Sequence, residues 1–389
     1  RKRKICVVIN NRANYARIKY FLKAAKKIKN IKLLIILGAS ANLEKYGNLE
    51  KTIRSDGFII NQKISTIIEG ENPMTMAKST GIGIIELSSI FQRIKPDIVL
   101  TVADRYETLA TAVAASYLNI FLAHTQGGEV SGSIDESVRH AITKLSHIHF
   151  PATKRAKLFL ERMGEDRKNI HLTGCPAIDI LRHEKLILDD KLIKKINLSK
   201  TGGNINFKKK FIILMQHPVT TEYNDSLTHI SETIKAVKKL VKKGIQILWL
   251  WPNIDAGSDI FSKEIRRYRE KNPKLKNIIL YKNFTPEEYA ILLNNCSCIV
   301  GNSSSGIRES SYLGIPTINI GTRQNFRETS SNVVHVGYSA EKIYEAVLKS
   351  FDKRFKKNSI YGDGRAGPRI AKILANCNLE VIKKLNYIN

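Results

Sequence analysis

Cysteine is scarce in this sequence, and long hydrophobic runs are absent from it. The 389 residues include five cysteines, an odd number without the paired spacing of a zinc site or a disulfide framework. We therefore expect reduced, mostly buried thiols and no metal site. The longest apolar runs, 211–215 and 245–251, are far shorter than the roughly 20 residues that cross a bilayer. No apolar segment with a cleavage site follows the basic start, so we expect a cytoplasmic protein without a membrane partner.

Acidic residues are also few. The sequence has 35 Asp and Glu against 64 Lys and Arg, a net charge of +29 that favours an anionic ligand. The lysines are spread over helix-like segments such as 22–32 and 235–244, where they would form solvated faces. Because no basic tract interleaved with aromatic residues is present, we expect no specific binding of nucleic acid.

Short β-branched runs alternate with helical periodicity along almost the whole chain. This alternation predicts an α/β protein with parallel sheets covered by helices on both faces. The chain is too long for one ordinary core, and the rhythm stops in a polar, linker-like segment, 186–209. We therefore predict two doubly wound, Rossmann-like domains, 1–185 and 186–366, and a final helix within 367–389. The strands are expected at 4–10, 33–38, 97–103, 120–125, 148–153, 170–174, 211–216, 247–251, 278–283, 298–302 and 317–321.

Polar residues follow many of these predicted strands. Ligands of open parallel sheets bind beyond the carboxyl ends of the strands, so these residues are candidates for one site in the cleft between the domains. They include Arg12, Asp104, Arg105, Gln126, Glu129, His217, Asn253, Ser303, Ser304, Glu309 and Arg323.

The segment GNSSSGIRES, 301–310, places hydroxyl and backbone N–H groups between a strand and a helix. Such a helix start suits a phosphate or diphosphate, although serine and asparagine are also ordinary helix caps. The carboxylate of Glu309 could accept both hydroxyls of a ribose, and Arg323 could bring positive charge to the anion or form a surface ion pair. His217, at a strand end before a proline, is suited to bind phosphate or to transfer protons.

The stretch HTQGGEVSGSIDESVRH, 124–140, combines acidic groups with a Gly-Gly pair. Its SIDE sequence fits a capping box, and Asp135 within it could merely complement the helix dipole. Capping does not explain Glu129 beside two glycines, nor Asp104 at the neighbouring strand end. Two or three carboxylates that reach one cleft are what general acid and base catalysis requires.

Together these residues resemble the hydrolysing UDP-N-acetylglucosamine 2-epimerases, which supply N-acetylmannosamine for sialic-acid-type sugars. The matching segments span almost the whole chain in order. They are NRANY (11–15), DRYE (104–107), GGEVSGSIDESVRHAITK (127–144), GCP (174–176), QHP (216–218), GNSSSGIRE (301–309), NIGTRQ (319–324), RET (327–329) and YGDGRA (361–366). The resemblance implies a glycosyltransferase-B-like fold, a final helix packed back on the first domain, and a homodimer or homotetramer.

The resemblance also implies a mechanism. A base removes the proton from C2 of the sugar, UDP leaves from C1, and water adds to the glycal, without a metal or nicotinamide cofactor. By position, Asp104 and Asp135 would belong to the acid and base set, and Asn253 is a further candidate for the substrate from its strand end. The groups that would hold UDP are Arg12, Arg105, His217, Ser303, Ser304, Glu309 and Arg323.

Two positions depart from the family pattern. Gln126 stands where some members carry a catalytic glutamate, and an amide cannot act as a general base. Either Glu129, Asp135 or His124 takes that proton, or Gln126 only positions sugar or water. Asn14 likewise replaces an acidic residue. Subgroups of the family act on UDP-N-acetylglucosamine or on UDP-2,4-diacetamido-2,4,6-trideoxyglucose, used toward legionaminic acid, and the sugar pocket decides between them.

Three alternatives remain open at this point. Non-hydrolysing 2-epimerases share the fold and the C2 chemistry, but their sequence resembles HVEAGLR where this chain has HTQGGEV. A glycosyltransferase of the same fold would need an acceptor site, for which the sequence has no signature. A catalytically silent protein would bind a UDP-sugar without turnover.

Overall fold

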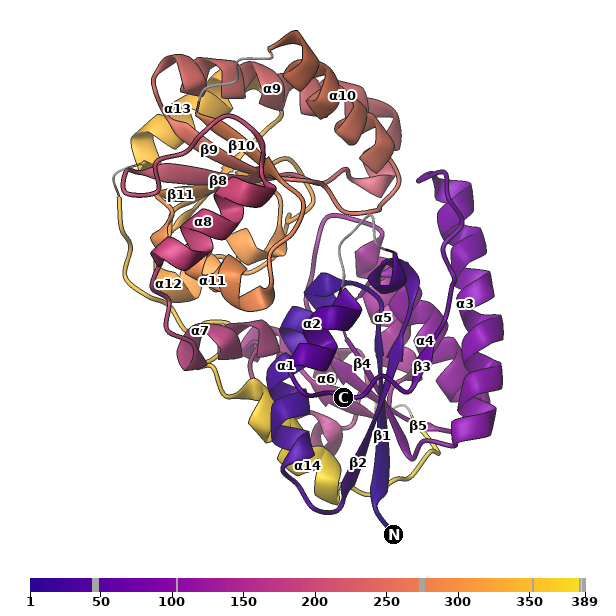
Figure 1. The fold of residues 1–389 in the computed structure, drawn as a ribbon. Helices are drawn as coiled ribbons and strands as arrows, with labels where there is room; N and C mark the ends of the chain where they lie inside the picture. The colour runs from indigo at the N-terminus through magenta and orange to yellow at the C-terminus, as the bar shows by residue number, and fades with distance from the viewer. Residues whose placement is uncertain (44–48, 103, 273–276, 352, 385, 387–389) are drawn as a thin grey trace.

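The computed structural model describes residues 1–43, 49–102, 104–272, 277–351, 353–384 and 386. These residues form two lobes, each built around one twisted sheet (Figure 1). The first sheet is parallel throughout and has the order β3-β2-β1-β4-β5-β6. Its strands are β1 (Arg3–Ile9), β2 (Ile31–Leu37), β3 (Gln62–Lys63), β4 (Ile98–Thr101), β5 (Phe121–Thr125) and β6 (Ile148–Phe150).

Both faces of the first sheet are buried. In β1, Ile5 and Val7 join one apolar core, whereas Cys6 and Val8 join the core on the opposite face, as the alternation of side chains along a strand requires. A strand buried on both sides has no polar face, and this is why β1 is a continuous apolar run. The helices of this lobe are α1 (Arg12–Lys26), α2 (Leu49–Ser55), α3 (Pro73–Ile94), α4 (Tyr106–Tyr117), α5 (Asp135–Leu145), α6 (Lys154–Arg162) and α7 (Asp179–His183).

The second sheet has the order β13-β12-β11-β8-β9-β10-β7, and only β7 runs antiparallel. Its strands are β7 (Thr201–Gly202), β8 (Phe211–Met215), β9 (Gln246–Leu250), β10 (Ile278–Tyr281), β11 (Cys298–Gly301), β12 (Thr317–Ile320) and β13 (Val333–Val336). Side chains of α8, α11 and α12 pack on one face, and those of α9, α10 and α13 on the other. These helices are α8 (Asp190–Ser199), α9 (Ser226–Lys242), α10 (Ser258–Lys271), α11 (Pro286–Asn295), α12 (Glu309–Leu313) and α13 (Ala340–Ser350).

The two sheets share one topology once β7 is set aside. In each, the strand order reverses beside the first strand, between β1 and β4 in one sheet and between β8 and β11 in the other. This is the order of a doubly wound nucleotide-binding fold, which binds its ligand in the crevice at the reversal. The prediction of two doubly wound, Rossmann-like sheets is confirmed.

Three parts of the fold differ from the sequence-based expectation. Residues 170–174 were expected to be a strand but contribute only one bridge, from Ile170 to His149, because β6 ends before Pro151, which has no N–H for a ladder. The linker-like segment 186–209 contains α8 and the edge strand β7. The short edge strands β3, β7 and β13 were not anticipated.

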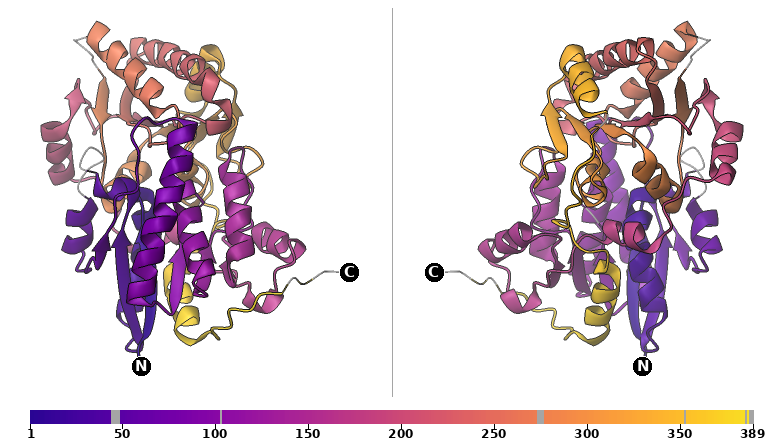
Figure 2. Two further views of the ribbon diagram at one scale, coloured as in Figure 1. Left: turned by 90° about the vertical axis from the view of Figure 1, so that its right-hand side faces the viewer. Right: turned by 90° about the vertical axis from the view of Figure 1, so that its left-hand side faces the viewer.

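The chain returns to the first lobe at its end. Helix α14 (Ala366–Asn376) packs against α1, and its Ile370, Ala371 and Leu374 belong to the core of the first sheet. Figure 2 shows this helix in yellow against the first lobe. The helix ends well before the end of the segment 367–389 in which it was expected, and residues 377–384 continue without regular structure along the same lobe. Residues 385 and 387–389 of that segment lie outside the described residues.

Candidate active site

A cavity of about 310 Å³ lies between the two sheets, at the carboxyl ends of their strands. It is lined from β1, β4 and β5 on one side and from β8, β9, β10, β11 and β12 on the other, through the loops that follow them. Ten candidate residues line it: Arg12, Asp104, Arg105, Asp135, His217, Asn253, Ser303, Ser304, Glu309 and Arg323. The fold therefore brings these residues together, although Arg12 and Arg323 are 311 positions apart in the sequence.

Asp104 is held by a buried arginine. Arg139, from α5, donates from its Nε to Asp104 over 2.9 Å and from its Nη2 to the Ser131 hydroxyl over 2.9 Å. Burial alone would raise the pKa of Asp104, but the guanidinium groups of Arg139 and Arg327 hold it well below its usual range. Asp104 is therefore a permanent carboxylate.

Asp135 has the opposite behaviour. It is the first residue of α5, and its backbone N–H donates to the Ser133 hydroxyl over 3.3 Å. Burial, and then the negative charges of Asp104 and Asp255, raise the pKa of Asp135 to about 6. Of the two carboxyl groups on this wall of the cavity, only Asp135 exchanges its proton close to neutral pH.

His217 presents a neutral ring to the cavity. Burial, and then the positive charge of Arg323, lower the pKa of His217 to about 3. Its Nδ1 accepts a hydrogen bond from the Asn253 backbone N–H over 3.1 Å, so the proton of the neutral ring is on Nε2. Asn302 fixes the backbone of His217 from both sides, over 2.7 and 2.8 Å. The imidazole is thus a fixed N–H donor and not a cation.

The serine-rich segment is less helical than its sequence suggests. A single 3-10 turn, Ser304–Gly306, follows β11, and Glu309 begins the five-residue α12. The Ser304 hydroxyl accepts a hydrogen bond from Arg17 over 3.1 Å. Glu309 is partly buried, and its desolvation raises its pKa. Its Oε2 has no hydrogen-bond partner among the described residues. Hydroxyl groups and an unpaired carboxyl oxygen therefore meet on this wall of the cavity.

Ion pairs join the two lobes around the cavity. Arg105 contacts Asp255 across the lobes over 2.8 Å, and its other contact is Glu107 in its own lobe over 3.1 Å. Arg323 lies 3.9 Å from Asp255 and donates to the Asn302 carbonyl over 3.3 Å. These contacts hold the two arginines beside the cavity.

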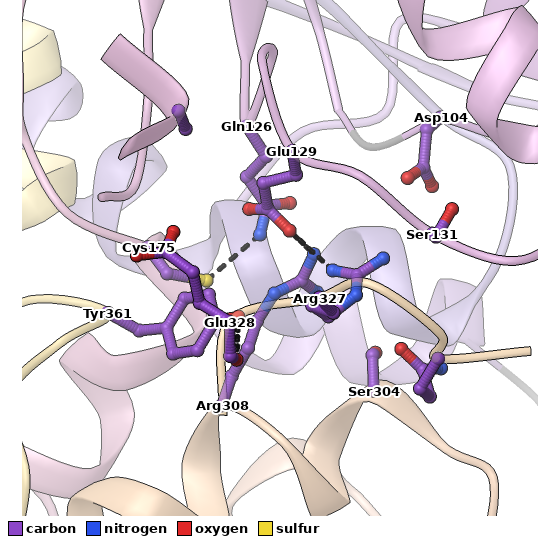
Figure 3. A network of polar contacts seen from close by, with 12 residues as sticks. Asp104, Gln126, Glu129, Ser131, Cys175, Ser304, Arg308, Arg327, Glu328 and Tyr361 are labelled. Carbon is purple, nitrogen blue, oxygen red and sulfur yellow. Dashed lines mark hydrogen bonds and ion pairs between the residues drawn. The ribbon is translucent and has the colours of Figure 1, made fainter. Parts of the chain in front are cut away.

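Glu129 does not line the cavity, contrary to its assignment as a catalytic base. It is buried behind the wall, where its Oε2 accepts hydrogen bonds from Arg308, over 2.6 Å, and from Arg327. Burial would raise the pKa of Glu129, but these two arginines lower it. An anion held by two cations is a poor proton acceptor, so this geometry favours Asp135 over Glu129 as the base. Figure 3 shows the three side chains facing one another.

Gln126 and His124 are also set back from the cavity. The amide of Gln126 donates to the Cys175 sulfur over 2.9 Å (Figure 3). The backbone of Gln126 has a positive φ of 63°. His124 is buried against Thr143, and burial lowers its pKa to about 3. Neither residue is among those that line the cavity.

Sequence reasoning missed three arginines of the cavity wall. Arg17, Arg308 and Arg327 line it; Arg308 and Arg327 are buried, and Arg17 is partly buried. Arg308 and Arg327 stand in the motifs GNSSSGIRE and RET, and Arg17 lies one turn and a half beyond Arg12 in α1. The signal that could have identified them was their residue type, because arginine suits an anionic ligand. In the structure, six arginines line this cavity. Among the described residues, no three His, Cys, Asp or Glu side chains form a group that could hold a metal ion.

Comparison with known proteins places this geometry in a family. The family profile described as UDP-N-acetylglucosamine 2-epimerase matches residues 23–375. The chain belongs to this family. It is 33% identical over 387 residues to the UDP-N,N'-diacetylbacillosamine 2-epimerase (hydrolyzing) of Legionella pneumophila, covering 99% of both chains. It is 30% identical to the UDP-N-acetylglucosamine 2-epimerase of Neisseria meningitidis serogroup B, covering 96% of this chain and 95% of the relative.

The epimerase family also has matching solved structures. The UDP-GlcNAc 2-epimerase of Methanocaldococcus jannaschii, solved with UDP-GlcNAc and UDP, superposes with a TM-score of 0.79 at 20% identity, covering 95% of this chain and 99% of that one. The glycosyltransferase-B-like fold is therefore confirmed. No helix among the described residues of this epimerase-family chain is long and apolar enough to span a membrane.

Proposed function

We propose that this chain is a hydrolysing 2-epimerase. It converts a UDP-2-acetamido sugar, either UDP-N-acetylglucosamine or UDP-2,4-diacetamido-2,4,6-trideoxyglucose, to UDP and the free manno-configured sugar. The observation that carries the proposal is the pair of carboxyl groups on one wall of the cavity, Asp104 and Asp135, whose pKa values are shifted in opposite directions. Titratable groups whose environments push their pKa values apart are the usual acid and base of an active site.

Asp135 and Asp104 have different roles in the proposed reaction. The Asp135 carboxylate, with a pKa of about 6, takes the proton from C2, because a base works best when its pKa lies near the working pH. The electron pair of the C2–H bond forms the C1=C2 double bond, and the electron pair of the C1–O bond leaves with UDP. Asp104, an anion throughout, stabilises positive charge that develops at C1. Water then adds its hydroxyl to C1, and the proton that the water loses is delivered to the opposite face of C2. Asp135 releases the abstracted proton to solvent and regains its charge.

The opposite wall suits the nucleotide. The Nε2–H of His217 and the hydroxyls of Ser303 and Ser304 are donors for a diphosphate, and the unpaired oxygen of Glu309 is an acceptor for ribose hydroxyls. Arginine groups add charge for the same anion, and Asn253 fills the wall beside His217. The remaining UDP contacts of the proposal are Arg12, Arg105 and Arg323.

The relatives favour hydrolysis over retention of the nucleotide. The Legionella pneumophila relative and the GDP/UDP-N,N'-diacetylbacillosamine 2-epimerase of Campylobacter jejuni, 29% identical over 395 residues, both carry the word hydrolyzing in their names. The stretch HTQGGEV also differs from the HVEAGLR type of the non-hydrolysing enzymes.

The test is the identity of the products. Each of the two UDP-sugars is incubated with the purified protein, and phosphorus NMR and chromatography follow the nucleotide and the sugar. We expect free UDP together with a free manno-configured sugar, and the substrate with the larger kcat/KM is the physiological class. A UDP-linked manno sugar would instead identify a non-hydrolysing epimerase, and binding of UDP-sugar without any product would identify a silent protein.

The same proposal includes the domain division 1–185, 186–366 and 367–389, and a homodimer or homotetramer as the assembled form. The two sheets and the return of α14 to the first lobe support the division. Light scattering coupled to size-exclusion chromatography measures the assembly, and a monomer at working concentration would contradict that part.

A further inference from the structure

Glu129 joins the two lobes behind the wall of the cavity. It belongs to the loop after β5 in the first lobe, whereas Arg308 and Arg327 follow β11 and β12 in the second. Its Oε2 accepts hydrogen bonds from both arginines, which also line the cavity. The side chain of Glu129 is 3% exposed and those of the arginines are 2% and 5% exposed, so water screens none of these charges.

The loop of Glu129 is shaped for this contact. Gly128, just before it, has a φ of +77°, and a Cβ atom there would come within 2.2 Å of the Ala156 carbonyl oxygen at α6. Only glycine allows so close an approach with this backbone conformation. The loop therefore lies against α6, with the Glu129 carboxylate at the two arginines.

The cluster is not neutral. One carboxylate stands against two guanidinium groups, so one positive charge remains beside the cavity. Among the residues that the structure describes, none accepts a hydrogen bond from the Nε–H groups of Arg308 and Arg327. The Arg308 guanidinium lies over the Tyr361 ring, 5.9 Å from its centroid. Burial, and then the charge of Arg308, lower the pKa of Arg327, whereas the Glu129 carboxylate raises it. The two guanidinium groups therefore repel each other, and Glu129 offsets that repulsion.

The same loop is tied to the proposed acid–base pair. Arg139 donates from its Nη1 to the backbone carbonyl of Glu129 over 2.8 Å and from Nε to Asp104 over 2.9 Å. A continuous chain of contacts thus leads from the second-lobe arginines, through Glu129, to the carboxylate that stands beside the sugar in the proposed reaction.

We propose that Glu129 is a positioning residue that holds Arg308 and Arg327 at the cavity wall, so that they stabilise the charge on the diphosphate as the C1–O bond breaks. This inference rests on the proposed function. Glu129 touches neither substrate nor a reacting atom and moves no proton. The bond electrons go to the departing UDP, and the two guanidinium groups receive that charge.

The experiment compares Glu129→Gln and Glu129→Asp with the wild type. The amide keeps the shape and loses the charge, whereas the shorter aspartate keeps the charge but cannot reach both arginines. We measure kcat and KM by UDP release and the UDP affinity and stoichiometry by calorimetry. The control is Glu165→Gln, which removes a similarly buried carboxylate paired with His149 and Lys144 away from the cavity.

We expect Glu129→Gln to lower kcat by about 100-fold, as loss of a transition-state donor does, with a smaller change in KM and with about one UDP still bound per chain. Glu129→Asp should fall between this variant and the wild type. If Glu129 only supported the fold, Glu129→Gln would lower the amount of UDP bound per chain by the same factor as kcat. Glu165→Gln should show that pattern if it unfolds part of the protein. That proportional loss, or an unchanged kcat, would overturn the proposal.

Failure of the proposed function is distinguishable from failure of this inference. If the wild type turns over neither UDP-sugar, UDP affinity still reports whether Arg308 and Arg327 are held in place for the diphosphate. Glu129→Gln should then weaken UDP affinity by about tenfold with unchanged stoichiometry. Unchanged UDP affinity in that case would overturn the role of Glu129 by itself.

Discussion

At the scale of single residues, the account depends on where carboxyl groups ionise. Asp104 lies among arginines and stays charged, while Asp135, a few residues away from Glu129 in sequence, retains its proton to about pH 6. Sequence alone gave both positions, from strand ends and from the resemblance. The sequence could not separate their roles, because the buried Arg139 holds Asp104 in its charged form. Arg139 is 35 positions from Asp104 and 10 positions from Glu129, whose carbonyl it also contacts.

The first prediction concerns Asp135→Asn. Only the ionised carboxylate accepts the C2 proton, so wild-type activity should rise with pH through about 6. The variant should lose about 1000-fold in kcat and show no such rise. Steady-state rates between pH 5 and pH 8 check this. If the residual activity of the variant still rose with pH through about 6, a group other than Asp135 would be responsible for that rise.

The second prediction concerns stability at the same residue. The folded state raises the pKa of Asp135 from 3.8 to about 6, so it binds a proton that the unfolded chain releases. Wild-type stability is therefore lost as pH rises from about 4 to 6 and stays reduced above it. Asp135→Asn should be more stable than the wild type at pH 7, and the gain should vanish near pH 4. Urea unfolding at both pH values measures it, and a gain that is equal at both would contradict the linkage.

At the scale of elements, loops meet across the cavity at a glycine. The backbone N–H of Gly132, between β5 and α5, donates to the Arg323 carbonyl over 3.2 Å, and a Cβ there would lie 1.9 Å from the Thr322 carbonyl oxygen. We expect Gly132→Ala to separate these loops and to lower kcat/KM about 100-fold, because a shift of about 1 Å is enough to misalign reacting groups.

The matched control for this substitution is Gly81→Ala. Gly81 lies in α3, where a Cβ would meet nothing within 4 Å, and alanine there should stabilise the helix by about 0.5–1 kcal/mol. Its kcat/KM should equal that of the wild type. Equal activity of Gly132→Ala and Gly81→Ala would show that the loop contact does not matter for turnover.

The end of the chain stabilises α5, the helix that begins with Asp135. Lys383 donates to three carbonyls at the other end of that helix and contacts Glu165 over 2.7 Å. Lys383→Met should cost about 2 kcal/mol of unfolding free energy, whereas Lys372→Met, at an exposed position of α14, should cost nothing measurable. Urea unfolding compares the two, and equal stabilities would refute this role of the tail.

The elements themselves could be predicted to different degrees. The long apolar strands such as β1 and β8 were evident, because burial on both faces leaves a continuous apolar run. The two-residue strands β3 and β7 were not, since so short a segment has no periodicity to detect. The contact of Glu129 with Arg308 spans 179 positions, and no local pattern encodes such a pairing.

At the scale of the whole molecule, charge converges on the cavity. The chain carries a net charge of +29, and six arginines line the cavity, namely Arg12, Arg17, Arg105, Arg308, Arg323 and Arg327. We expect kcat/KM and UDP affinity to fall several-fold between about 50 and 300 mM salt, as screening shortens the reach of these charges. Uridine, which lacks phosphate, is the control and should bind independently of salt; equal salt dependence would contradict the account.

The central claim is that the cavity removes a proton from C2 and releases UDP in the same turnover. Proton NMR of the reaction in deuterated water tests it most directly, with both UDP-sugars in parallel. The account predicts free UDP and a free manno-configured sugar that carries deuterium at C2. A released sugar that keeps its original hydrogen and configuration at C2 would contradict it, because UDP would then have left by simple hydrolysis without the action of Asp135.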